Sequence, residues 1–96
     1  MIVLQIEHPV RDFDAWKGAF DSDPVDRERG GVRSYRVLRP VDDPNYVVVD
    51  LEFVTRPEAE AFREALRDLW RGAEAAGLIE SPRVRIVESV ETKAYS

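Results

Sequence analysis

The sequence predicts an α+β fold with the element order strand, helix, strand, strand, helix, strand, and three observations carry this prediction. Apolar residues alternate with others at the N-terminus, as they do in a strand with one buried face. Two later segments space their apolar residues by three and four, as amphipathic helices do. Two β-rich runs flank a segment dense in turn formers, which is typical of a hairpin.

The first half of the chain begins with a strand and a helix. The strand is expected over residues 2–6, with the alternating apolar residues Ile2, Leu4 and Ile6. Asp12 is a suitable N-cap for the helix, which should end near Pro24 and whose apolar stripe consists of Phe13, Trp16 and Phe20. Residues 23–31 predict one more short helical turn, because Asp suits a cap, Pro the first helical position and Gly the exit.

The hairpin is expected to pair residues 32–39 with residues 46–53. Its second strand should face the helices with Val47, Val49, Leu51 and Phe53, and face away from them with Tyr46, Val48, Asp50 and Glu52. The phase of the first strand stays open. The side facing the helices could carry either of two alternating sets, which are Val32, Ser34, Arg36 and Leu38 or Arg33, Tyr35, Val37 and Arg39.

The second half adds the longer helix and the last strand. Residues 55–58 fit a capping box, and the helix should continue to Gly77 with an apolar stripe formed by Ala59, Phe62, Leu66, Leu69 and Ala73. Trp16 and Trp70 lie on the two helical stripes and are expected in the core. Residues 83–90 should form the fourth strand, with Val84 and Ile86 on the face opposite to Arg83, Arg85 and Val87.

Right-handed crossovers turn this order into two interleaved split βαβ units, the ferredoxin-like arrangement. We expect one domain, 1–96, with a four-stranded antiparallel sheet in the order 4-1-3-2 and both helices on one face. The other face would leave apolar residues in water, namely Val3, Tyr46, Val48 and Val87. A second copy stacked on that face would cover them, so the sequence predicts a homodimer with a barrel between the two sheets.

Composition excludes several classes of partner and site. Fourteen Lys and Arg against nineteen Asp and Glu give a net charge of −5, which disfavours nucleic acid and anionic lipid surfaces. No run approaches the ~20 apolar residues of a membrane span, and residues 1–7 lack the features of a signal peptide. Without cysteine there is no disulfide and no argument for an oxidising compartment, so we expect a cytoplasmic protein.

Three segments of the chain are similar to a known superfamily. They are residues 12–17 (DFDAWK), the 39–45 turn (RPVDDPN) and residues 58–62 (EAEAF). With the element order, they resemble the dimeric α/β-barrel superfamily, and within it small bacterial proteins related to the antibiotic biosynthesis monooxygenases. The resemblance covers nearly the whole chain and implies the ferredoxin-like fold.

The activities that the resemblance implies are diverse. The superfamily includes cofactor-free monooxygenases of polycyclic aromatic compounds, haem-degrading enzymes, peroxidase relatives, polyketide cyclases and ligand-sensing domains, so fold alone does not set function. The haem degraders rely on an Asn and a helical His, whereas the only Asn here is Asn45 and the second helix has no His. The quinone-forming oxygenases place an Asn near their substrate, where strand one here offers Gln5 and Glu7.

His8 is the only histidine and lies at the end of strand one. It is either a general base that reaches the mouth of the barrel or a solvated side chain at a strand end. One His without Cys supplies too few ligands for the usual zinc sets, so we predict no metal. No glycine-rich nucleotide loop and no nucleophile elbow is present, and we expect no cofactor.

Polar residues gather on the sheet face away from the helices. Strand phase places there Gln5, Glu7, Tyr46, Asp50, Glu52, Arg83 and Arg85. In one interpretation, a carboxylate among them acts as an acid or base in a pocket between two sheets. In the other, these residues form ion pairs with the partner subunit.

Two functions follow from this cluster and stay open. The first is an enzyme, a monooxygenase or cyclase that binds a small aromatic or polyketide-like compound in the barrel. Gln5, Tyr46, Asp50 and Arg85 would orient this compound, and Glu7 or His8 would move the proton. The second is a non-catalytic ligand-binding or dimerisation module. A pocket of ~300 Å³ or more would favour the first and a filled interior the second.

Overall fold

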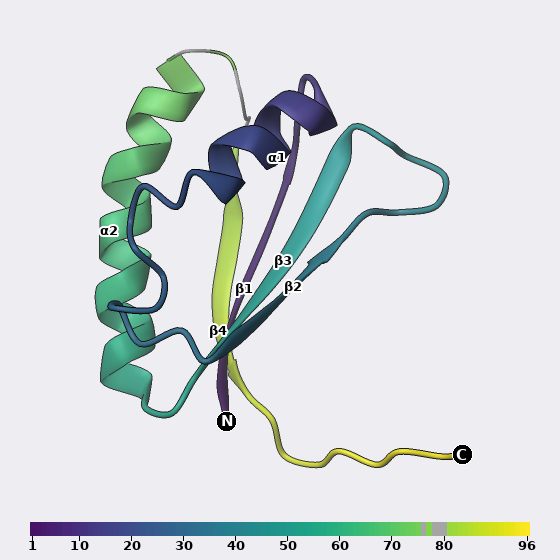
Figure 1. Cartoon of the computed structure of the whole chain (residues 1–96), viewed down its shortest axis with the longest axis vertical. Coiled ribbons are helices and arrows are strands. Elements are labelled where there is room, and N and C mark those ends of the chain that lie inside the picture. The colour runs from purple at the N-terminus through teal and green to yellow at the C-terminus, as the bar shows by residue number, and fades with distance from the viewer. Residues whose placement is uncertain (76, 78–80) are drawn as a thin grey trace.

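The computed structural model describes residues 1–75, 77 and 81–96 and has the predicted element order (Figure 1). Its elements are β1 (Ile2–Pro9), α1 (Phe13–Asp21), β2 (Ser34–Leu38), β3 (Tyr46–Phe53), α2 (Arg56–Ala75) and β4 (Arg83–Glu88). All neighbouring strands pair antiparallel, in the order β2-β3-β1-β4. The ferredoxin-like fold and the predicted sheet order are confirmed.

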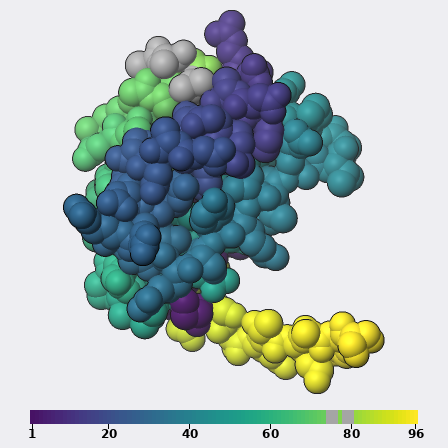
Figure 2. All heavy atoms as spheres, in the orientation of Figure 1, coloured from purple at the N-terminus to yellow at the C-terminus, as the bar shows by residue number. Residues whose placement is uncertain are grey.

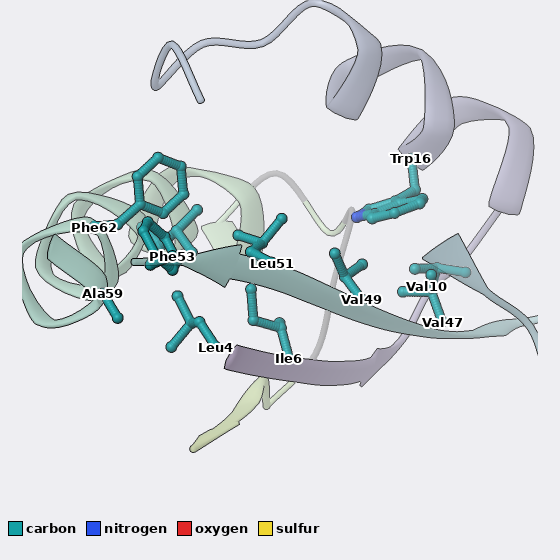
Figure 3. Packing of buried hydrophobic residues seen from close by; sticks show 11 residues of the cluster. Leu4, Ile6, Val10, Trp16, Val47, Val49, Leu51, Phe53, Ala59 and Phe62 are labelled. Carbon is teal, nitrogen blue, oxygen red and sulfur yellow. The ribbon is translucent and has the colours of Figure 1, made fainter. Parts of the chain in front are cut away.

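The two central strands, β1 and β3, carry most of the core. Alternate residues of both strands face the helices and are buried, and these are Leu4, Ile6, His8, Val47, Val49, Leu51 and Phe53. Figure 3 shows Trp16 reaching from α1 toward the sheet, while Phe62 of α2 lies beside Phe53. Both helices therefore cover the same face, as the burial pattern of the strands requires.

Helix α1 starts as the sequence predicts and ends earlier. The Asp12 carboxylate accepts hydrogen bonds from the backbone N–H groups of Asp14 and Ala15 at 3.0 and 3.4 Å, which makes it the N-cap. The prediction of another helical turn within 23–31 is wrong. Asp23 and Asp26 have φ of +52° and +60°, and such left-handed residues interrupt a right-handed helix, so this segment folds as a series of turns.

Helix α2 confirms the predicted capping box. The Glu58 carboxylate accepts from the Thr55 backbone N–H at 3.2 Å, and the Thr55 hydroxyl accepts from the Glu58 backbone N–H at 3.4 Å. Beyond the helix, Gly77 adopts a left-handed φ of +76°, which suits the exit from a helix.

Strand β2 resolves the phase that the sequence leaves open. The ring of Tyr35 contacts Phe20 of α1 edge to face, so Tyr35 lies on the helix side, together with Val37. Arg36 therefore lies on the opposite face, paired in register with Asp50. Strands β2 and β4 are both shorter than predicted, although Arg33 and Ser89, just outside them, still donate backbone hydrogen bonds to Glu52 and Met1.

The sheet face opposite to the helices, called here the open face, is uncovered in the single chain. Residues 89–96 run away from the body on the side opposite to α2 (Figure 1), with Val90 and Tyr95 almost fully exposed. Figure 2 shows a hollow between this tail and the 39–45 turn. Among the described residues no helix is long and apolar enough to cross a membrane.

Candidate functional site

A cavity of about 410 Å³ lies between the sheet and the two helices. Its floor is formed by β1 and β3, and its walls by α1, the 22–27 turns and the second half of α2. It is lined by Ile6, His8, Trp16, Ala19, Phe20, Ser22, Asp23, Pro24, Val25, Arg27, Val49, Leu51, Leu66, Leu69, Trp70, Gly72 and Ala73. The volume is within the range of small-molecule sites, and most of the lining is apolar or aromatic.

One wall of the cavity is aromatic. The rings of Trp16 and Phe20 stack with their centroids 5.2 Å apart, because they are one helical turn apart on α1. Trp70 lies on the other wall, on α2. Both tryptophans have the predicted contact with the core, because Trp16 belongs to the buried cluster and Trp70 packs against it. Both also line the cavity, which was not predicted. Flat aromatic surfaces on two walls suit a planar ligand.

His8 contributes the imidazole of the cavity. The interpretation of His8 as a solvated strand-end residue is wrong, because the residue is only 2% exposed and points toward the helices. Its Nδ1 lies 3.0 Å from the carbonyl oxygen of Pro9, and its ring meets Trp16 edge to face with centroids 6.0 Å apart. Since a carbonyl only accepts hydrogen bonds, Nδ1 carries the proton in the neutral ring and Nε2 keeps its lone pair.

Burial lowers the pKa of His8 below its ordinary value of 6.5, because the charged form loses hydration, and the hydrogen bond to Pro9 opposes this only in part. The imidazole is therefore neutral at pH 7. A neutral imidazole with a fixed tautomer and a free Nε2 lone pair is able to accept a proton from a bound molecule.

On the open face, polar side chains form a row across all four strands. Arg36 donates to the Asp50 carboxylate at 3.0 Å, and Arg85 donates through Nε to the Gln5 side-chain oxygen at 3.0 Å. Gln5 is the register partner of both Asp50 and Arg85, so the four residues are cross-strand neighbours. The Asp50 side chain is only 10% exposed, whereas that of Arg36 is 71% exposed.

Glu7 and Tyr46 form a second polar pair on the open face. The Tyr46 hydroxyl donates to the Glu7 carboxylate at 2.8 Å. This hydrogen bond to Glu7 raises the pKa of Tyr46, because ionisation would remove the donated proton.

Of the six residues that the sequence proposes for a site, only His8 lines the cavity. The other five share the open face: Gln5, Glu7, Tyr46, Asp50 and Arg85. Glu7 and His8 are adjacent in one strand and therefore point to opposite faces of the sheet. They do not act on one molecule from the same side.

Sequence reasoning missed Phe20, Trp70 and Arg27 as residues of the candidate site. Apolar stripes on two helices also describe an ordinary core, so the aromatic residues gave no separate signal. Arg27 lies in the 23–31 segment, whose turns set the direction of its side chain. Among the described residues, no group of three His, Cys, Asp or Glu is arranged to hold a metal ion.

Comparison with known proteins finds similar solved structures but no matching family. No family model and no curated protein matches the chain. A candidate antibiotic biosynthesis monooxygenase from Nitrosomonas europaea is 25% identical with a TM-score of 0.71, over 95% of this chain and 100% of that one. SnoaB from Streptomyces nogalater, a cofactor-independent oxygenase solved as a variant, is 17% identical with a TM-score of 0.73, over 95% and 94% of the two chains.

A further solved structure has the same fold. A Nitrosomonas europaea protein of unknown function is 15% identical with a TM-score of 0.75, over 99% of this chain and 94% of that one. These likenesses extend over the whole fold, so the resemblance expected from the sequence is confirmed. The chain has the ferredoxin-like fold of the antibiotic biosynthesis monooxygenase-like proteins.

Proposed function

We propose that the chain is a homodimeric, cofactor-independent monooxygenase that acts on a flat aromatic compound bound between the sheet and the helices. The observation that carries this proposal is the cavity, in which the His8 imidazole stands beside the aromatic wall of Trp16 and Phe20. SnoaB, a cofactor-independent oxygenase with the same fold, supports this chemistry. We place the protein in the cytoplasm, because a cysteine-free chain needs no oxidising compartment.

The proposed reaction starts with proton transfer to His8 Nε2. A substrate that carries an acidic CH₂ between aromatic rings loses one proton and becomes a carbanion, which the planar walls hold in place. The carbanion forms a C–O bond to O₂, and the peroxide takes back the proton. Elimination of water then breaks the O–O bond and leaves a ketone. The substrate supplies all the electrons, so one O₂ is consumed for each quinone formed.

Anthrone tests this proposal, because its conversion to anthraquinone and water requires one O₂ and nothing else. We expect the protein to accelerate O₂ uptake above the rate in buffer, with one mole of O₂ used per mole of quinone. If anthrone binds but O₂ uptake stays at the buffer rate, the oxygenase proposal is wrong and the chain is a ligand-binding module. If anthrone does not bind, the cavity is not a site for flat aromatic compounds.

The open face supports the homodimer. Val3, Val48 and Val87 are half-buried on this face, and the side chain of Arg36, which pairs with Asp50, is 71% exposed there. The hollow between the tail and the 39–45 turn also leaves room for a second body against this face (Figure 2). A second copy stacked on the open face would cover these side chains.

Sedimentation should therefore find a dimer at micromolar concentration, with an interface of at least ~1,000 Å² in total. Asp50→Asn should weaken it by up to ~3 kcal/mol, because Arg36 would be buried without its counter-charge. Glu64→Gln is the control, since Glu64 pairs with Arg67 on the exposed side of α2. A monomeric wild type, or equal dimers in both variants, would contradict this use of the open face.

A further inference from the structure

The wall of the cavity carries a cation beyond its aromatic rings. From His8 the wall continues through Trp16 to Phe20, and the guanidinium carbon of Arg27 lies 4.0 Å from the centroid of the Phe20 ring. We propose that the cavity selects aromatic anions, and that Arg27 binds the carboxylate of the ligand while His8 lies at the other end of the wall. This inference rests on the proposed binding of a flat aromatic compound in the cavity.

Arg27 is held in a fixed position. Its guanidinium lies over the rings of Phe20 and Tyr35, at 4.0 and 4.9 Å, and its Nη1 donates to the Phe20 carbonyl oxygen at 2.8 Å. Its side chain is only 16% exposed. A cation that is already stacked and immobilised loses little further freedom when it binds a ligand, and a partly buried cation interacts strongly with an anion.

The hydrogen-bonding capacity of Arg27 is not used up by the described residues. A guanidinium has five N–H donors in a planar fork that matches a carboxylate. One is taken by Phe20. The Asp23 carboxylate is 3.5 Å from Nη1, beyond a good hydrogen bond, and its Oδ1 instead accepts the backbone N–H of Arg27 at 2.9 Å. Asp23 therefore offsets part of the charge without occupying the fork.

Asp23 also lines the cavity, so it opposes an incoming anion. Two substitutions at the same place should consequently act in opposite directions. Arg27→Gln removes the cation and leaves a polar side chain of similar reach. Asp23→Asn removes the negative charge, keeps an oxygen that caps the Arg27 N–H, and tolerates the left-handed backbone at this position.

The test compares 2-naphthoate with 2-naphthamide, which have nearly the same shape and differ in charge, by calorimetric titration at pH 8, where His8 is neutral. We expect wild type to bind naphthoate about tenfold more tightly than naphthamide. Arg27→Gln should abolish this ratio, Arg27→Lys should keep part of it because Lys is a cation without the fork, and Asp23→Asn should increase it.

The ratio of the two affinities shows whether Arg27 recognises the carboxylate or only stabilises the 23–31 segment. If Arg27→Gln weakens both probes equally and leaves their ratio unchanged, Arg27 is a structural residue and the inference is wrong. If wild type binds both probes equally, the inference is wrong while the cavity remains a site for aromatic compounds. If wild type binds neither probe, the cavity proposal itself fails and this inference fails with it.

Discussion

Replacing Phe62 with alanine should lower the free energy of unfolding by about 3–5 kcal/mol, the usual cost of deleting a buried aromatic ring. Phe62 is 4% exposed, and its ring centroid is 5.6 Å from that of the fully buried Phe53. The ring also lies against Gly30, where an added Cβ would stand 2.6 Å from Phe62 Cδ1. Truncation therefore opens a cavity between α2, the sheet and the 23–31 turns, which rigid neighbours fill only in part.

Urea melts at constant protein concentration measure this loss, because dimerisation would otherwise shift the midpoint. Leu69→Ala is the matched control on the same helix, where the residue is 38% exposed. It should cost less than about 1.5 kcal/mol, since a half-exposed side chain gives up less burial. A loss below ~1 kcal/mol for Phe62→Ala would mean that this stripe of α2 is not core.

His8→Gln should reduce anthrone turnover about 10²- to 10⁴-fold, the typical contribution of a general base. The substitution keeps a polar group at the site but removes the Nε2 lone pair that accepts the proton. Binding of anthrone should change much less, because Trp16, Phe20 and Trp70 remain in place. The effect should therefore appear in kcat rather than in KM.

Glu7→Gln is the matched control, since Glu7 is the next residue of β1 and points to the open face. It should leave turnover within about twofold, because Glu7 faces away from the cavity and the Gln amide oxygen can still accept from the Tyr46 hydroxyl. A large loss in Glu7→Gln with normal turnover in His8→Gln would place the chemistry on the open face instead.

The pH profile of turnover offers a separate check on His8. Because burial lowers the pKa of His8, the proton-accepting form should persist below pH 6.5, and the rate should fall only in more acidic buffer. The same shift makes the folded state bind fewer protons than the unfolded state in that range. Stability should therefore decline as the pH falls below 6.5.

The fold was predictable because its signals are local and repeated. Period-two alternation in β1 and β3, the Asp12 cap and the Thr55 capping box each specify one element, and right-handed crossovers leave one sheet order. The 23–31 segment was not predictable in this way. Its course depends on two Asp residues in left-handed conformations, and Asp occupies helix caps just as readily.

The site was harder to predict, because alternation along a strand gives the face of a residue but not which face has room for a ligand. The sequence placed Asp50 and Arg85 correctly on the face away from the helices. Sequence reasoning also assigned the ligand to that face, because most polar candidate residues lie there. The cavity exists because α1 and α2 do not fill the space above β1 and β3, and His8 lines it only because β1 continues to Pro9. Neither property is encoded in a short motif.

The central claim is that ligands bind on the helix side of the sheet, and nuclear magnetic resonance mapping with anthraquinone, the product of the proposed reaction, tests it most directly. We expect the largest shifts at the indole N–H groups of Trp16 and Trp70 and at the His8 ring, which all line the cavity. Shifts confined to Gln5, Asp50 and Arg85, with the two indoles unchanged, would contradict the claim and return the site to the open face.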